Sequence, residues 1–226
     1  SVMEKQIVDF KKTVYISEIK TNPRNTIPPK ELDIYIPDKK LAIEFDGIFW
    51  HSYDRLETSE EKNRHYNKTQ LCDQKGIKLF HIFENEWIDT NKQEIWKSIL
   101  SKSLCSTSYT KIYARKCIIQ LVSSNDKTAF LLQNHLQGYC NSKINIGLYF
   151  NNELISLMSF GKPRFNKKYD WELLRYCTKK YTTVVGGASR LFDFFKRNYA
   201  GSIISYCDLR YSTGQLYQLL KMKLLH

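Results

Sequence analysis

Three acidic residues alternate with apolar residues in one short stretch of the chain. Asp33 stands in the first apolar run, Glu44 and Asp46 stand in the second, and His51 follows shortly afterwards. Burying a carboxylate costs several kcal/mol unless a cation or hydrogen-bond donors compensate it. Because the neighbouring residues are strongly apolar, the pattern predicts that a divalent metal ion compensates these acids.

The two apolar runs flank the sequence Pro37-Asp-Lys-Lys40, which is typical of a turn. The stretch therefore predicts a β-hairpin. Side chains alternate between the two faces of a strand, so Glu44 and Asp46 are expected on one face and Ile43 and Phe45 on the other.

The elements around the hairpin are predicted from hydrophobic periodicity and from helix stop signals. Glu4 falls on the first helix, while His65 and Lys68 share one face of the second, which Gly76 is expected to end. This order predicts an α/β sandwich around a small mixed sheet. The predicted elements are a helix over 3–14, a strand near 15–20, the hairpin, a helix over 64–75, a strand over 77–83 and a helix over 91–104.

The spacing of Asp33 and Glu44-x-Asp46 resembles the PD-(D/E)XK nuclease arrangement, with Asp46 where a lysine usually stands. The run Gly47-Ile-Phe-Trp-His51 is similar to the Gly-Cys-Phe-Trp-His run of very-short-patch-repair endonucleases. Gly76-Ile-Lys-Leu-Phe-His-Ile-Phe-Glu84 resembles that family's Gly-Trp-Arg-Val-Leu-x-x-Trp-Glu strand. Over residues 1–105 the pattern resembles phage homing endonucleases of the EDxHD type, which implies a restriction-endonuclease-like mixed sheet flanked by helices.

The resemblance implies that Asp33 and Glu44 hold the metal, Mg²⁺ or Mn²⁺. Such an ion neutralises the charge that develops on a phosphodiester during hydrolysis, and it activates water. The resemblance implies further catalytic roles for residues that match, or replace, family positions. These residues are Glu4, Asp46, His51, His65 and Lys68.

Lys68 has a second interpretation. The lysine that normally stabilises the transition state is absent from the second strand, because Asp46 takes its place. The helix that carries Lys68 is expected to pack beside the sheet, so Lys68 could supply the missing charge. Without the resemblance, His65 and Lys68 would be ordinary residues of a solvated helix face, and His81 and Trp87 would be packing residues.

The net charge of +12 is confined to the second half of the chain. Residues 1–105 contain 17 basic and 17 acidic residues, which leaves 18 of the 35 basic and 6 of the 23 acidic residues beyond them. A one-sided basic excess interleaved with tyrosines is typical of a module that binds nucleic acid. The domains are therefore predicted as 1–105 and 106–226, with a Ser/Thr-rich boundary.

Double-stranded DNA is the expected partner, bound through basic residues of the second domain. Phosphate contacts give affinity without reading the sequence. The candidate phosphate contacts are Arg115, Lys116, Lys162, Arg164, Lys167, Lys168, Arg190 and Arg210.

The second domain is predicted to contain a helix over 126–136, a hairpin over 144–160, a strand over 171–177, a helix that Gly186 opens and a strand over 202–207. Glu172-Leu-Leu-Arg175, Val185-Gly-Gly-Ala-Ser189 and Ser205-Tyr-Cys-Asp208 resemble the GNAT acyltransferase fold, in particular its phage Mom-like DNA-modifying branch. The resemblance implies an α+β domain. The glycine-rich loop lacks the opening Gln or Arg of the acyltransferase loop, whose backbone amides face the cofactor pyrophosphate.

No apolar run is long enough to span a bilayer, and the six cysteines form no CxxC pair. These features predict no membrane partner and a cytoplasmic location, in the cytoplasm or nucleoid of the host cell if the protein is phage-encoded. The leading hypothesis is a Mg²⁺-dependent DNA endonuclease. The alternatives are a DNA-modifying acyltransferase and a non-catalytic DNA-binding protein. The sequence does not distinguish a monomer from a homodimer.

Overall fold

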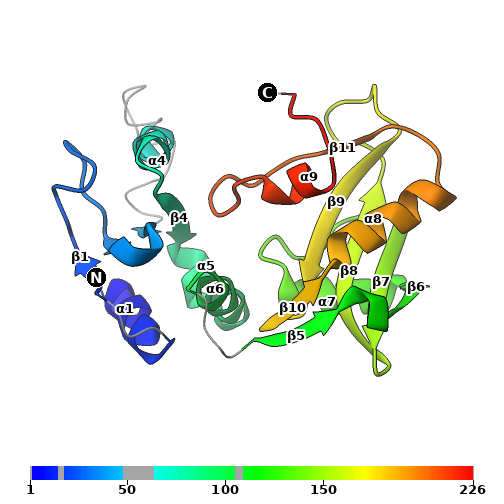
Figure 1. Cartoon of the computed structure of the whole chain (residues 1–226), viewed down its shortest axis with the longest axis horizontal. Coiled ribbons are helices and arrows are strands. Elements are labelled where there is room, and N and C mark those ends of the chain that lie inside the picture. Colours follow the sequence, from blue (N-terminus) through cyan, green and yellow to red (C-terminus); the bar gives the residue numbers. More distant parts are fainter. Residues whose placement is uncertain (1, 15–17, 48–63, 105–108, 226) are drawn as a thin grey trace. The chain divides into compact units, whose positions relative to one another are not determined.

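The computed structural model describes residues 2–14, 18–47, 64–104 and 109–225 (Figure 1). The chain is a mixed α/β protein, as the sequence predicts. It divides into two compact units, Ser1–Ser106 and Thr107–His226, one residue from the predicted boundary.

The first unit is built around a mixed sheet in the order β1-β2-β3-β4. The pairs β1/β2 and β2/β3 are antiparallel, and β3/β4 is parallel. Its elements are α1 (Val2–Val14), β1 (Lys20–Thr21), β2 (Ile34–Ile36), the 3-10 turn η1 (Pro37–Lys39), β3 (Leu41–Asp46), α4 (Arg64–Gln74), β4 (Lys78–Phe83), α5 (Glu84–Ile88) and α6 (Thr90–Ser103).

The predicted hairpin is confirmed. Strands β2 and β3 pair with Ile34 opposite Ile43, and the chain reverses through η1. Lys40 ends this turn in the left-handed region, at φ 45°, and its backbone N–H donates to the carbonyl of Pro37 at 3.0 Å. The predicted stop of α4 is also confirmed, because Gly76 follows the helix with φ 64°.

Helices cover both faces of this sheet. On one face Ala42 and Leu79 form a core cluster with Cys72 of α4. On the other face the ring of Phe80 packs against Trp96 of α6, with centroids 6.2 Å apart. Alternation along β3 and β4 therefore puts Glu44, Asp46 and His81 on the face that α4 covers.

The second unit contains a five-stranded sheet in the order β11-β9-β8-β7-β6 and a separate parallel pair, β5/β10. In the larger sheet only β11/β9 is parallel. The elements are β5 (Thr110–Tyr113), the turn η3 (Ala114–Lys116), β6 (Ile118–Leu121), α7 (Ser124–Asn134), β7 (Ile144–Phe150), β8 (Glu153–Gly161), β9 (Trp171–Thr178), β10 (Thr182–Val185), α8 (Gly187–Asn198), β11 (Ile203–Ser205) and α9 (Gln215–Leu219).

Two helices enclose the larger sheet, and Figure 1 shows α8 lying across its strands. Leu191, Phe192 and Phe195 of α8 belong to the main core cluster with Phe160 of β8. The rings of Phe160 and Phe195 stack with centroids 3.5 Å apart. Helix α7 contributes Leu131 to a second cluster.

Several predicted elements differ from the observed ones. Of the predicted strand 15–20, the described part forms β1 only at Lys20–Thr21. Helix α7 begins two residues before the predicted start at 126, and Ser123 caps it by accepting from Asp126 N at 3.1 Å. The short α5 and β10 were not predicted, because too few residues form them for a periodic signal.

None of the helices in the described part of the chain combines the length and the apolarity needed to cross a bilayer.

Phe160 provides a test of the second core. Replacing it with alanine should lower the free energy of unfolding by about 3–5 kcal/mol, because the lost ring leaves a cavity against Phe195. Urea unfolding followed by circular dichroism measures the loss. Phe165→Ala is the matched control, since that ring is exposed and its removal opens no cavity. Equal stabilities of the two variants would contradict this account of the core.

Candidate functional site

Strand β3 carries two buried carboxylates on one face of the sheet. Glu44 is 5% exposed and Asp46 is 3% exposed, although each has apolar neighbours along the strand. Both side chains lie under α4. The charge of each carboxylate must therefore be compensated by other groups of the protein. Glu44 and Asp46 have different partners.

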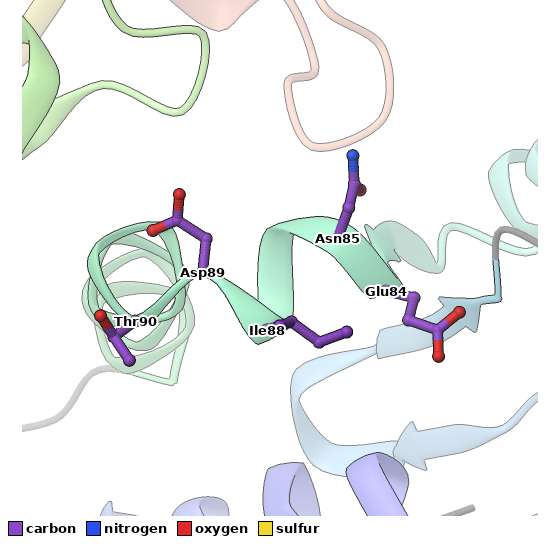
Figure 2. A pocket seen from close by; sticks show the side chains of 5 residues that line it. All are labelled: Glu84, Asn85, Ile88, Asp89 and Thr90. Carbon is purple, nitrogen blue, oxygen red and sulfur yellow. The ribbon is translucent and has the colours of Figure 1, made fainter.

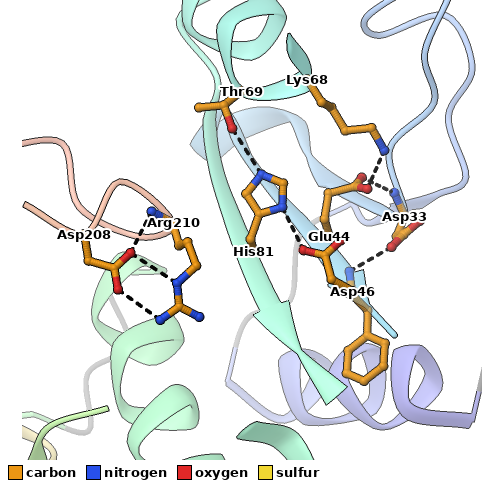
Figure 3. A network of polar contacts seen from close by, with 9 residues as sticks. Asp33, Glu44, Asp46, Lys68, Thr69, His81, Asp208 and Arg210 are labelled. Carbon is orange, nitrogen blue, oxygen red and sulfur yellow. Dashed lines mark hydrogen bonds and ion pairs between the residues drawn. The ribbon is translucent and has the colours of Figure 1, made fainter. Parts of the chain in front are cut away.

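Asp33 and Glu44 are linked through the backbone of the hairpin (Figure 3). The backbone N–H of Asp33 donates to Glu44 Oε1 at 3.0 Å. The N–H of Phe45 donates in turn to Asp33 Oδ2 at 2.8 Å. The two predicted metal-binding carboxylates are thus brought together where β2 begins, beside Glu44 and Phe45 of β3. Asp33 is half-buried, so this end of the pair reaches the surface.

Lys68 reaches from α4 to Glu44. Its Nζ forms a buried ion pair with Glu44 Oε2, and Figure 3 shows the side chain pointing from the helix to the strand. Lys68 is itself buried, so the interpretation as a solvated helix face is wrong for this residue. Two acids and one lysine therefore meet at a single point, although the lysine comes from a helix and not from β3.

The environment of Glu44 favours its neutral form. Burial, followed by the nearby charge of Asp33, raises the pKa of Glu44 to about 7, while Lys68 and the Asp33 N–H act in the opposite direction. The carboxyl is thus held near the point of ionisation at neutral pH. A cation that arrives at the site would favour its ionised form.

Asp46 is bonded to His81 of β4. The distance from His81 Nδ1 to Asp46 Oδ2 is 2.9 Å, and His81 Nε2 lies 3.1 Å from Thr69 Oγ1 of α4. The ring is therefore held at both nitrogens. The interpretation of His81 as a packing residue is incomplete, because it joins helix and sheet through hydrogen bonds. In the β3/β4 register His81 lies opposite Glu44, and this position places His81 on the same face of the sheet as Glu44 and Asp46.

The donor set at Asp33 and Glu44 fits a hard cation. Mg²⁺ is usually held by one or two carboxylates, with water and substrate phosphate completing its coordination. In the part of the chain that the structure describes, no group of three His, Cys, Asp or Glu side chains is arranged as a metal site.

Three predicted site residues lie outside this geometry. Glu4 is on α1 and His65 is on α4, but their side chains are outside the described part of the structure, as is all of His51. The structure therefore brings together Asp33, Glu44 and Lys68.

The segment after β4 carries two more acids. Glu86 is buried and accepts from Trp96 Nε1 at 3.1 Å. Glu84 lines a surface pocket with Asn85, Ile88, Asp89 and Thr90 (Figure 2). Its Oε2 lies 3.7 Å from the point that a Cβ on Gly47 would occupy, next to the end of β3.

The predicted DNA-binding residues of the second unit fall into separate groups. Arg115 and Lys116 are exposed on η3, and Arg190 of α8 donates to the carbonyl of Ala114 beside them. A second group, Lys162, Arg164, Lys167 and Lys168, occupies the loop between β8 and β9.

Arg210 differs from those residues because its charge is offset. Its Nη2 lies 2.9 Å from Asp208 Oδ2, and its Nε donates to Asp208 Oδ1 at 3.2 Å (Figure 3). Arg210 therefore offers less free charge to a phosphate than the exposed lysines do.

A pocket in the second unit is lined by residues of β9, β11 and the segment that follows β11. Arg175 lies in its wall, where its Nη1 donates to the carbonyl of Leu174 at 2.8 Å. Burial, together with the charge of Arg175, lowers the pKa of His135 in the same wall to about 4. The pocket thus presents a neutral imidazole and a cation at neutral pH.

The raised pKa of Glu44 predicts that the stability of the fold depends on pH. Because its folded pKa of about 7 exceeds the ordinary value of 4.5, the folded protein binds the proton more tightly than the unfolded chain does. The contribution of Glu44 to stability is therefore fully present below about pH 4.5 and is lost as the pH rises toward 7. In Glu44→Gln this fall should shrink by about 1–3 kcal/mol, as measured by urea unfolding in EDTA across that range.

Glu31→Gln is the control, because Glu31 is exposed beside Arg24 at the start of the same hairpin. It should keep the wild-type profile. A Glu44→Gln profile parallel to that of the wild type would contradict the assignment.

No protein family, curated protein or solved structure matches this chain. The geometry of the site therefore carries the functional argument.

Proposed function

We propose that the first unit is a metal-dependent DNA endonuclease of the homing-endonuclease type. The observation that carries the proposal is the meeting of Asp33, Glu44 and Lys68. Two acids and one lysine are the residue types of the PD-(D/E)XK arrangement that the sequence resembles. The ion pair supports the hypothesis that Lys68 replaces the lysine missing from β3.

The proposed chemistry is hydrolysis of a phosphodiester. Asp33 and Glu44 would hold Mg²⁺ or Mn²⁺, which would supply charge neutralisation and an activated water. Lys68 would place a positive charge where negative charge develops in the transition state. The bonds from the Asp33 and Phe45 N–H groups fix both carboxylates in advance, so little reorganisation would be needed on binding.

The Asp46–His81 pair would support this site from the same face of the sheet. Asp46 Oδ2 is bonded to His81 of β4 and not to Lys68, so its role would be to position β3 against β4. Glu4, His51 and His65 keep their proposed catalytic roles from the resemblance.

The second unit would bind the DNA. The net positive charge lies entirely there, and exposed basic residues on η3 and on the β8–β9 loop would contact phosphates. A homodimer would bring two nuclease sites to one duplex.

A DNA-modifying acyltransferase remains the second candidate, and the pocket along β9 and β11 favours it. Helix α8 begins after Gly186, which has φ 76°, and its N-terminus could face a phosphate group. Tight binding of acetyl-CoA without any DNA cleavage would favour this candidate over the nuclease.

Cleavage of a mixed genomic DNA in Mg²⁺ tests the proposal. The wild type should produce breaks or nicks that EDTA abolishes, and Asp33→Asn should reduce the rate by about 10²-fold or more, because one of the two metal-binding carboxylates is lost. Asp38→Asn is the matched control, since that acid is exposed in the turn of the same hairpin. Absence of metal-dependent cleavage, or equal rates for wild type and Asp33→Asn, would sink the proposal.

Lys68 is tested separately. Lys68→Met should lower the cleavage rate by about 10²- to 10³-fold, because the charge facing the scissile phosphate is removed. Lys12→Met, on the exposed part of α1, should cut at the wild-type rate. Circular dichroism and the unfolding midpoint establish that each variant is folded. A folded Lys68→Met protein that cuts as fast as the parent would refute the role of Lys68.

A further inference from the structure

The loop between β8 and β9 holds a phenylalanine ring out into solvent. Phe165 is 72% exposed, whereas the neighbouring Pro163 is buried. Exposing a whole phenyl ring forgoes the stabilisation that its burial would supply. A single exposed ring needs no explanation by itself, so its surroundings decide whether it has a role.

A buried carboxylate fixes the loop that carries this ring. Glu172 of β9 is fully buried, and its Oε2 accepts from the backbone N–H of Arg164 at 2.7 Å. Its Oε1 accepts from Arg164 Nε at 2.8 Å and lies 2.6 Å from Arg164 Nη2. The residue next to Phe165 is therefore anchored by its main chain and by its side chain. The exposed position of the ring is built into the loop.

A second ring lies beside Phe165. Tyr206, which follows β11, is 41% exposed and meets Phe165 edge to face, with centroids 5.3 Å apart and planes at 87°. The guanidinium of Arg164 lies 5.5 Å from the centre of the Phe165 ring. We call Phe165 and Tyr206 the aromatic platform. One ring supports the other, and a large part of Phe165 remains open.

Positive charge surrounds the aromatic platform. Lys162, Lys167 and Lys168 are exposed on the same loop. Glu172 offsets the charge of Arg164, and the carboxylate of Asp170 accepts from the N–H of Ser202 at 2.7 Å, so the three exposed lysines leave the loop with a net positive charge. An aromatic face among exposed lysines matches the chemistry of a nucleic-acid strand, with its flat bases and anionic phosphates. An apolar protein partner would instead have to desolvate these charges.

We propose that the aromatic platform stacks on an unpaired base of bound DNA, while the lysines of the same loop contact the adjoining phosphates. The inference rests on the proposed DNA binding by the second unit. Within a duplex both faces of a base are covered by its neighbours, so a ring can stack only on a base that has left the helix or lies in a single strand. The platform would thus hold a locally opened strand.

The test measures binding of the full chain to fluorescein-labelled oligothymidylate of about 20 nucleotides and to a duplex of the same length, both in EDTA so that no cleavage occurs. Phe165→Leu keeps an apolar side chain but removes the ring, and its affinity for the single strand should fall about five- to a hundred-fold. Its affinity for the duplex should change less than two-fold or so, and Phe165→Trp should restore single-strand binding.

Tyr139→Leu is the matched control, because Tyr139 is an exposed ring with Lys127 Nζ 4.4 Å from its centroid. It should bind both probes as the wild type does. Single-strand affinity that is unchanged in Phe165→Leu, or lowered equally in both Leu variants, would overturn the platform alone. Equal losses on single strand and duplex would overturn the assignment to an unpaired base. A wild type that binds neither probe would overturn DNA binding by the second unit, and the platform with it.

Discussion

The buried ion pair between Lys68 and Glu44 is the constraint on which the first unit depends. A carboxylate inside a sheet costs several kcal/mol unless it is compensated, and removing one partner of a buried pair is more costly than never forming it. The pair therefore ties the rotation and position of α4 to β3. It also gathers in one place the charges that phosphodiester hydrolysis requires, so the same contact serves the packing of the unit and its proposed chemistry.

A second polar connection runs parallel to the first. Asp46, His81 and Thr69 link β3, β4 and α4 on the same face of the sheet. Apolar contacts alone would let a helix slide or rotate over a sheet with little penalty, whereas hydrogen-bonded partners accept only one arrangement. The two connections together explain how a small sheet can hold Asp33 and Glu44 in a defined relation. The backbone N–H groups of the hairpin also hold the two carboxylates, because they donate hydrogen bonds to Glu44 and Asp33.

The second unit uses a buried acid for a different purpose. Glu172 is fully buried on β9, and its contacts with Arg164 reach outward to shape a basic loop. In the first unit the buried Glu44 holds Lys68 at an inner site. In the second unit the buried Glu172 holds Arg164 in an exposed loop. This difference agrees with the charge distribution, since the first half of the chain is neutral and the second carries the entire excess of +12. It supports the division of labour between cleavage and DNA binding that we propose.

Local signals in the sequence were enough to predict the hairpin, the shared face of Glu44 and Asp46, the end of α4 at Gly76 and the division of charge. Each depends on residues close together in the chain, where backbone geometry dictates which side chains share a face.

The partners of the two acids were decided by tertiary structure. Lys68 lies 24 residues beyond Glu44, and nothing local distinguishes it from an exposed helical lysine. His81 likewise resembles a packing residue until the parallel β3/β4 register sets it opposite Glu44 and beside Asp46. Only the packing of α4 on the sheet selects these partners, because a buried charge must be satisfied by whichever side chain the fold brings within reach.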